Sequence, residues 1–430
     1  MAGAQPTFQL KTPSGSNVAF MLRALRYRNY QLFFGGQIVS LTGTWITTTA
    51  TSWLVYRITG SALLLGVVGF ASQFPAFLLT PFAGIFVDRW NRHRLLVATQ
   101  TLLMLTSFAL AVLTLTGTIS IPSLLVVSVV QGLVTAFDMP TRQAFVVTLI
   151  EDKNDLGNAI ALNSSMFNAA RLLGPTVAGA IIAASNEGWC YLIDGISFLA
   201  VIAALLAMRV PATSFNTGRA VSAAQQFKEG WEYAYNHRAI RSIIILIALI
   251  CLLAFPYIVL IPIFAGTILH GGPHTLGLLM TASGCGALLG AVYLAGRRSI
   301  AGLGQVIVAA GTVFGLGLTA FAFSHVLWLS VVLMVVVGFG GMVEVASSNT
   351  LLQTMVDDDK RGRVMAFFLM AYFGTAPFGS LMAGWVSDRY GAPITVAFGG
   401  ACAVAGAIWF ATTLSSIEHQ LAPVYVRADG

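Results

Sequence analysis

Charged side chains are scarce in this chain of 430 residues. Asp, Glu, Lys and Arg make up 9% of it, against 57% for hydrophobic residues. A soluble globular domain carries about 25% charged residues, so this composition excludes a domain that folds in water. In hydrocarbon every backbone polar group must be satisfied within its own segment. We therefore expect an all-α membrane protein.

Cysteine is also rare. The four cysteines, Cys190, Cys251, Cys285 and Cys402, lie in or beside different apolar runs. Their spacing fits neither a disulfide framework nor a metal site. We expect four core thiols and no bound metal.

Catalytic motifs are missing too. The sequence has no G-x-S-x-G, no H-E-x-x-H and no phosphate-binding G-x-x-x-x-G-K-[ST]. His270 and His274 are four residues apart, but Gly271, Gly272 and Pro273 interrupt any helix between them. We expect neither an enzyme nor an ATP-driven pump, and no cofactor.

Long apolar runs are what the chain has instead. About 20 apolar residues are enough to cross the hydrocarbon core of a bilayer. Twelve such runs occur, at residues 31–56, 63–87, 95–117, 121–147, 156–184, 189–209, 241–267, 275–296, 302–322, 325–350, 362–386 and 392–414. The sequence therefore predicts twelve transmembrane helices.

Basic residues indicate how these helices are oriented. Of the 23 Lys and Arg residues, Arg57 and Arg389 fall in loops that odd-numbered runs enter, and Arg171 lies inside a run. All the others fall on the opposite side, which the positive-inside rule assigns to the cytoplasm. We expect both termini there and no nucleic-acid partner, although the net charge is +7.

A polar stretch at residues 210–240 divides the apolar runs into two sets of six. Phe227, Trp231 and Tyr235 recur within it at helical spacing, which is typical of an amphipathic helix on a membrane surface. A simple tether remains an alternative for this linker. The predicted organisation is a cytoplasmic tail at 1–30, bundles at 31–209 and 241–414, the linker at 210–240 and a tail at 415–430.

The two halves repeat each other. Asp152, Gly157, Gly174 and Gly179 recur 205 positions later as Asp357, Gly362, Gly379 and Gly384. The segment from Gly60 to Gly66 recurs 211 positions later, from Gly271 to Gly277. Internal repeats of this kind are typical of transporters whose site lies between two pseudo-symmetric halves.

A charged hinge separates the second and third runs. Gly84, Asp88, Arg89, Arg92 and Arg94 form a G-x-x-x-D-R-x-x-R-x-R pattern there. This pattern resembles the loop signature of the major facilitator superfamily, the twelve-helix secondary transporters with two six-helix bundles. The resemblance extends over residues 31–414 and implies a gating latch, with a structural anchor as the alternative.

Two further motifs carry the resemblance. Gly174, Pro175 and Gly179 are similar to the G-P-x-x-G-G motif of its antiporter branches, with Ala178 in place of one glycine. They imply a helix that rocks, or a fixed kink. Gln131 and Gly132 match the end of the antiporter pattern R-x-x-Q-G, but Ser128 replaces its arginine.

With Asp138, Pro140 and Arg142 in the fourth run, these motifs resemble macrolide-efflux and enterobactin-export proteins. The resemblance implies proton-driven export of an amphipathic drug, macrolide or siderophore from the cytoplasm. Nutrient uptake on the same fold and a ligand sensor that transports nothing remain alternatives. The expected partners are the small-molecule substrate, protons and the bilayer. We expect a monomer in the cell inner membrane.

Four charges inside the runs are candidates for coupling, because a charge there costs about 2.5–3.5 kcal/mol on insertion scales. Glu344 has no basic residue within a helical turn, and a buried carboxyl of this kind suits proton uptake and release. Asp138 lies at a nearly equivalent place in the other half, but Arg142 follows one turn later and leaves a structural or gating pair open. Asp194 lies near a loop and could be structural. Arg171 could hold an anionic group or pair with an acid.

Other polar or aromatic side chains are candidates for a central cavity, because ligand pockets are mostly apolar with a few convergent polar groups. Packing is the alternative for each of them. The candidates are Trp45 in the first run, Gln73 in the second, and Asn163 and Asn168 in the fifth.

Overall fold

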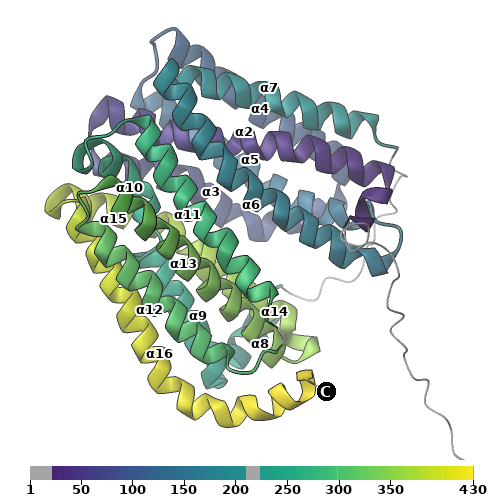
Figure 1. Cartoon of the computed structure of the whole chain (residues 1–430). Coiled ribbons are helices and arrows are strands. Elements are labelled where there is room, and N and C mark those ends of the chain that lie inside the picture. Colours follow the sequence, from purple (N-terminus) through teal and green to yellow (C-terminus); the bar gives the residue numbers. More distant parts are fainter. Residues whose placement is uncertain (1–21, 210–222, 298, 430) are drawn as a thin grey trace, which may run out of the picture.

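The structure, a computed structural model, describes residues 22–209, 223–297 and 299–429, which form helices and their connections (Figure 1). The first half contains η1 (Arg23–Arg26), α2 (Arg28–Thr59), α3 (Ala62–Arg89), α4 (Arg92–Leu115), α5 (Ile121–Thr148), α6 (Lys153–Ala184) and α7 (Glu187–Ala207). The linker helix is α8 (Ala223–Asn236). The second half contains α9 (Arg238–Leu253), α10 (Tyr257–Ile263), η2 (Phe264–Ile268), α11 (Pro273–Ala295), α12 (Leu303–Ala322), α13 (Leu327–Met355), α14 (Asp358–Gly374), α15 (Ala376–Tyr390) and α16 (Ala392–Asp429).

Eleven helical segments of the described chain are long and apolar enough to cross a membrane, and each falls on a predicted run. The remaining run, 31–56, falls on α2, whose threonines and serines lower its hydropathy. At 32 residues α2 is long enough to span, and it packs along α6 and α7. It therefore completes the first six-helix bundle. The helix α16 continues beyond the predicted run to Asp429.

Two of the predicted runs are interrupted. The seventh is divided by the turn at 254–256 into α9 and α10, and continues as the π-helical segment η2. The eleventh is divided at Thr375 into α14 and α15, with Pro377 at the start of α15. Proline lacks the N–H that would continue the helical ladder. Both interruptions lie in the second half, where they break helices that border the other bundle.

The two halves form separate bundles that meet at one end. Helices α3 and α6 of the first bundle pack against α15 and α11 of the second. Figure 1 shows the bundles converging at one end and diverging toward the other, where η1 and α8 lie. We call the diverging end the tail end. The opposite end, with the connections at Gly60 and Gly391, is the far end.

Close glycine contacts join the bundles near the far end. A Cβ built on Gly66 would lie 2.5 Å from the Ser380 carbonyl oxygen and 2.9 Å from the Gly384 Cα. A Cβ on Gly277 would lie 2.5 Å from the Pro175 carbonyl oxygen and 3.3 Å from the Gly179 Cα. The internal repeats relate Gly66 to Gly277 and Gly384 to Gly179. The two contacts are therefore one contact made twice by a pseudo-twofold axis, and we call them the glycine seams.

A branched side chain in a seam is expected to part the bundles at the far end. For Gly277→Val, overpacking costs about 1–3 kcal/mol, which shifts a two-state equilibrium toward the parted state by about 5- to 150-fold. Spin labels at Thr59→Cys and Arg389→Cys, in a background without the native cysteines, report the distance between the far ends. Gly157→Val is the control, since a Cβ at Gly157 meets nothing within 4 Å. Equal distance distributions in the two variants would refute a closing role for the seam.

Candidate functional site

Polar contacts between the bundles gather in the half of the molecule near the far end. Tyr56 Oη lies 2.8 Å from Thr267 Oγ1, and Thr176 Oγ1 lies 2.6 Å from Thr281 Oγ1. The other hydrogen bonds that join described residues of the two bundles are Ser61 with Asp388, Gln73 with Ser380, Thr49 with Met280 and Thr281 with the Leu172 carbonyl. The far end is therefore closed by direct contacts between the bundles.

Arg171 lies near the middle of α6, just on the tail side of these contacts. Its guanidinium lies over the Trp45 ring, 5.9 Å from the ring centroid. Four residues later Pro175 has no N–H, so the Arg171 carbonyl lacks its helical donor. Its carbonyl oxygen lies beside Gly284 of α11, 3.6 Å from where a Cβ would stand. Among the described residues, no carboxylate oxygen lies within 4.0 Å of the guanidinium.

Glu344 is the enclosed acid of the second bundle. It lies on α13 with 0% of its surface exposed. The Ser348 hydroxyl donates to its Oε1 at 3.4 Å, a long hydrogen bond. Its Oε2 has no hydrogen-bond partner among the described residues. The structure therefore encloses a carboxyl group that has no cation beside it.

Two tyrosines of the second bundle lie near Arg171. Arg171 interacts electrostatically with both Tyr257 of α10 and Tyr372 of α14, and Glu344 interacts with Tyr372. The Tyr257 hydroxyl is 3.0 Å from the Ser283 hydroxyl. The sequence interpretation missed both tyrosines. Their signal was a phenol inside an apolar run, which is weak because tyrosine also serves as core packing.

Both carboxylate oxygens of Asp138 have partners. The Thr99 hydroxyl and the Gln100 amide donate to its Oδ1 at 2.8 and 2.7 Å, and Arg142 forms an ion pair with its Oδ2. Arg142 also donates to Gln37 of α2 at 3.4 Å. The cluster joins α2, α4 and α5 within one bundle.

Asp194 on α7 is also satisfied, but by hydroxyl groups. Thr47 of α2 and Ser107 of α4 donate to its Oδ2 at 2.9 and 2.7 Å. Ser197 lies 3.5 Å from its Oδ1. These bonds tie three helices of the first bundle together, and no arginine or lysine takes part. Asp194 therefore accepts hydrogen bonds from uncharged donors only, whereas Asp138 forms an ion pair with an arginine.

The remaining cavity candidates do not gather at one point. Trp45 packs edge-on against Phe167, with ring centroids 5.8 Å apart. Gln73 is exposed and donates to the Gly69 carbonyl at 3.0 Å and to Ser380 at 3.5 Å across the bundles. Asn168 donates to the Ser164 carbonyl of its own helix, and Asn163 is half-buried. Of these four, Trp45 lies beside the Arg171 guanidinium.

The gating candidates fall into two groups. Gly84, Asp88 and Arg89 lie in the last turns of α3, and their side chains fall outside the part of the chain that the structure describes. Arg92 and Arg94 begin α4, with Asn91 as its N-cap. Gly174, Pro175 and Gly179 line the contact with α2 and α11, where a Cβ on Gly174 would overlap Trp45.

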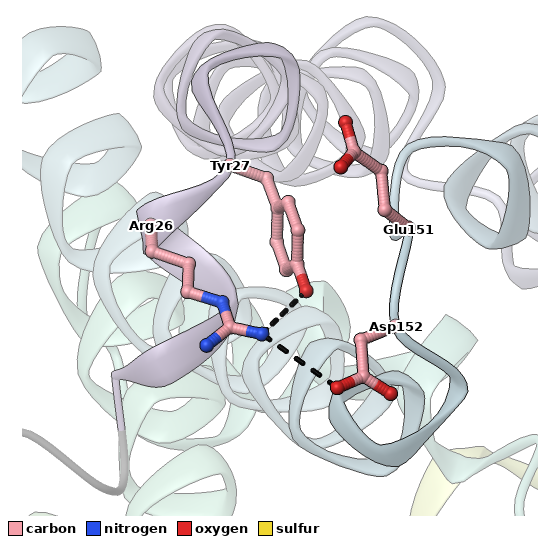
Figure 2. Close-up of a pocket in the computed structure, with 4 residues that line it drawn as sticks. All are labelled: Arg26, Tyr27, Glu151 and Asp152. Carbon is pink, nitrogen blue, oxygen red and sulfur yellow. Dashed lines mark hydrogen bonds and ion pairs between the residues drawn. The ribbon is translucent and has the colours of Figure 1, made fainter.

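An open depression of about 890 Å³ lies at the tail end and is lined by Arg26, Tyr27, Glu151 and Asp152 (Figure 2). Arg26 donates to the Tyr27 hydroxyl at 2.8 Å, which raises the pKa of Arg26, and it pairs with Asp155 at 2.7 Å. The Tyr27 hydroxyl donates to Asp155 at 2.9 Å, and in the second half the Tyr233 hydroxyl donates to Asp357 at 3.2 Å. The contacts around the depression hold η1 against α6. The depression lies apart from Arg171 and Glu344.

Comparisons with known proteins agree with this architecture. A family model described as transmembrane secretion effector matches residues 21–425. The staphyloferrin A transporter of Staphylococcus aureus is 26% identical over 360 residues, covering 84% of this chain and 89% of that protein. The multidrug efflux pump Tap of Mycolicibacterium fortuitum is 27% identical over 359 residues, covering 81% and 87%. The crystal structure of the nucleoside transporter NupG superposes with a TM-score of 0.67 at 16% identity, covering 91% and 99%.

Proposed function

Because the chain belongs to the transmembrane secretion effector family of major facilitator transporters, we propose that it exports amphipathic small molecules in exchange for protons. Membership makes it a multi-pass secondary transporter and not an enzyme. The names of its relatives, a staphyloferrin A transporter and a multidrug efflux pump, support export of a drug-like compound or a siderophore. The site is the region between the bundles around Arg171.

The tail end is the cytoplasmic end in this proposal. Arg23, Arg26 and Arg28 lie there, as the positive-inside rule favours. The membrane is then the bacterial cytoplasmic membrane, since the relatives above are bacterial. With the far end closed by the glycine seams, the structure corresponds to an inward-facing state that loads its cargo from the cytoplasm.

The observation that carries proton coupling is the isolation of Glu344. An uncompensated carboxylate inside a protein costs several kcal/mol, and a bound proton removes that charge. Asp138 has Arg142 as a counter-ion and Asp194 has three hydroxyl donors, whereas Glu344 has one long hydrogen bond and no counter-ion. The other titratable groups near Glu344 are Cys251 and Tyr372.

We place Glu344 in an alternating-access cycle. It takes a proton when the outward-facing state exposes it, and its neutral form is enclosed when the seams close. The proton is released toward the cytoplasm through the tail end, and cargo enters from the same end. The far end then reopens with cargo bound and without the proton, so one crosses in exchange for the other. The bundles supply the two states, because packed interfaces are bistable rather than continuously deformable.

Everted membrane vesicles test the exchange. Respiration acidifies their lumen, and a pH-sensitive acridine dye reports the gradient by its fluorescence quenching. A transported drug or siderophore is expected to release protons from the lumen and restore fluorescence in vesicles with the protein. Control vesicles contain the protein with Gly66 and Gly277 both changed to Val, which disfavours closure of the far end. If neither drugs nor siderophores restored the dye fluorescence, the result would contradict proton exchange.

A further inference from the structure

Arg171 is a cation near the middle of the bundle whose charge no described residue neutralises. We infer that the cargo is an organic anion with an aromatic part, held by Arg171 where the two bundles meet. That this anion is transported rests on the proposed function, but its binding to Arg171 does not. It narrows the cargo from amphipathic compounds in general to those that carry a carboxylate, phenolate or similar group.

The acids of the bundle are committed elsewhere. Asp138 pairs with Arg142, and Asp194 accepts hydrogen bonds from Thr47 and Ser107. Glu344 belongs to the other bundle and lies beyond ion-pair distance of Arg171. An arginine inside a membrane protein faces a cavity or a partner, because its charge is costly in hydrocarbon. The missing counter-ion is therefore supplied by the ligand.

The surroundings of Arg171 select an aromatic ligand. Trp45 lies under the guanidinium, and Phe167 packs edge-on against Trp45. Phe167 has 44% of its surface exposed, so it still offers a ring face or edge. Arginine on an aromatic face keeps its in-plane N–H groups free, and that planar fork matches a carboxylate with two parallel hydrogen bonds. Trp45 therefore orients the cation without neutralising it.

The second bundle completes the site with polar groups that carry no charge. Tyr257 and Tyr372 are within electrostatic reach of Arg171. On α11, Gly284 lies beside the Arg171 carbonyl, and Thr281, one helical turn earlier, bonds the Leu172 carbonyl. Phenol hydroxyls can donate to an anion, whereas the Thr281 hydroxyl is already bonded to Thr176 and the Leu172 carbonyl. A cation faced by neutral donors and aromatic rings favours an anion over an amine, which would meet like charge.

Direct binding of a matched pair of probes tests this inference. The probes are radiolabelled 2-naphthoate, an anion, and 2-naphthamide, its uncharged counterpart, and scintillation proximity measures their binding to the full-length protein in detergent. We expect the wild type to bind naphthoate more tightly than naphthamide. Arg171→Gln is expected to weaken naphthoate binding by about 10- to 100-fold, as loss of a charge-assisted bidentate pair implies, and to leave naphthamide binding within about twofold. Arg171→Lys is expected to recover part of the naphthoate affinity.

The exposed Arg209 provides the control for net charge, so Arg209→Gln is expected to bind both probes as the wild type does. Equal loss of both probes in Arg171→Gln, with recovery of neither in Arg171→Lys, would overturn the inference and make Arg171 structural. Failure of the wild type to bind naphthoate, or preference for 2-naphthylmethylammonium, would also overturn it. No proton gradient is needed, so naphthoate binding through Arg171 without proton exchange would reject the proposed coupling while the anion site stands.

Discussion

Replacement of Glu344 by glutamine is expected to abolish uphill export while cargo exchange across the membrane continues. Glutamine keeps the shape of the side chain and its contact with Ser348, but it cannot bind and release a proton. The variant should therefore behave as an exchanger whose rate no longer depends on pH between about 5 and 8. Counterflow of labelled cargo, without a gradient, measures exchange, and accumulation under an imposed pH gradient measures uphill export.

The matched control is Glu232→Gln, the same substitution at an exposed position of α8. It should export as the wild type does. Asp194→Asn provides a second comparison, because its carboxylate is stabilised by hydroxyl donors and is not needed as a proton carrier in this account. Full uphill export by Glu344→Gln, with the pH dependence of the wild type, would remove Glu344 from the mechanism.

Asp138→Ala is expected to give the largest loss of stability. It leaves Arg142 without its counter-ion and the Gln100 amide without its acceptor, whereas the Thr99 hydroxyl keeps the Leu96 carbonyl. Removing one partner of a buried ion pair costs about 3–5 kcal/mol. The lower end applies here, because the Arg142 side chain is 23% exposed. Thermal unfolding in detergent, followed by tryptophan fluorescence, should show a Tm several degrees below that of the wild type.

A double variant separates the lost pair from other damage. Removing the stranded charge as well, by Asp138→Ala with Arg142→Leu, should recover part of the lost stability, because no unpaired guanidinium remains. Double-mutant analysis is informative for such directly contacting residues. If the double variant lost at least as much unfolding free energy as the two single variants together, Asp138 and Arg142 would not be a stabilising pair.

The fold was predictable because its signals are long and repeated. Each apolar run is longer than the bilayer requires, and its ends are set by charged or Gly and Pro residues. The repeat that relates Gly66 to Gly277 and Gly179 to Gly384 was visible as a spacing. What the spacing could not give was the pairing of Gly66 with Gly384, since contacts between helices depend on their packing in three dimensions.

The candidate site was less predictable, because one sequence does not fix which way a helix is rotated. Glu344 and Asp138 occupy similar places in the repeats, yet Arg142 and Gln100 satisfy Asp138 whereas Glu344 is left without a cation. The four-residue spacing between Asp138 and Arg142 already indicated an ion pair as one alternative. The bonds of Asp194 to α2 and α4 join residues far apart in the sequence, and no local pattern announces them.

Coupled flux in oriented proteoliposomes tests the central claim most directly. Proton movement and the movement of a labelled organic anion would be recorded together under an imposed pH gradient, with the tail end facing a known side. The account predicts that cargo moves toward the far end while protons move toward the tail end, and that a reversed pH gradient reverses both. Cargo and protons that move in the same direction, or cargo flux that leaves the proton gradient unchanged, would contradict it.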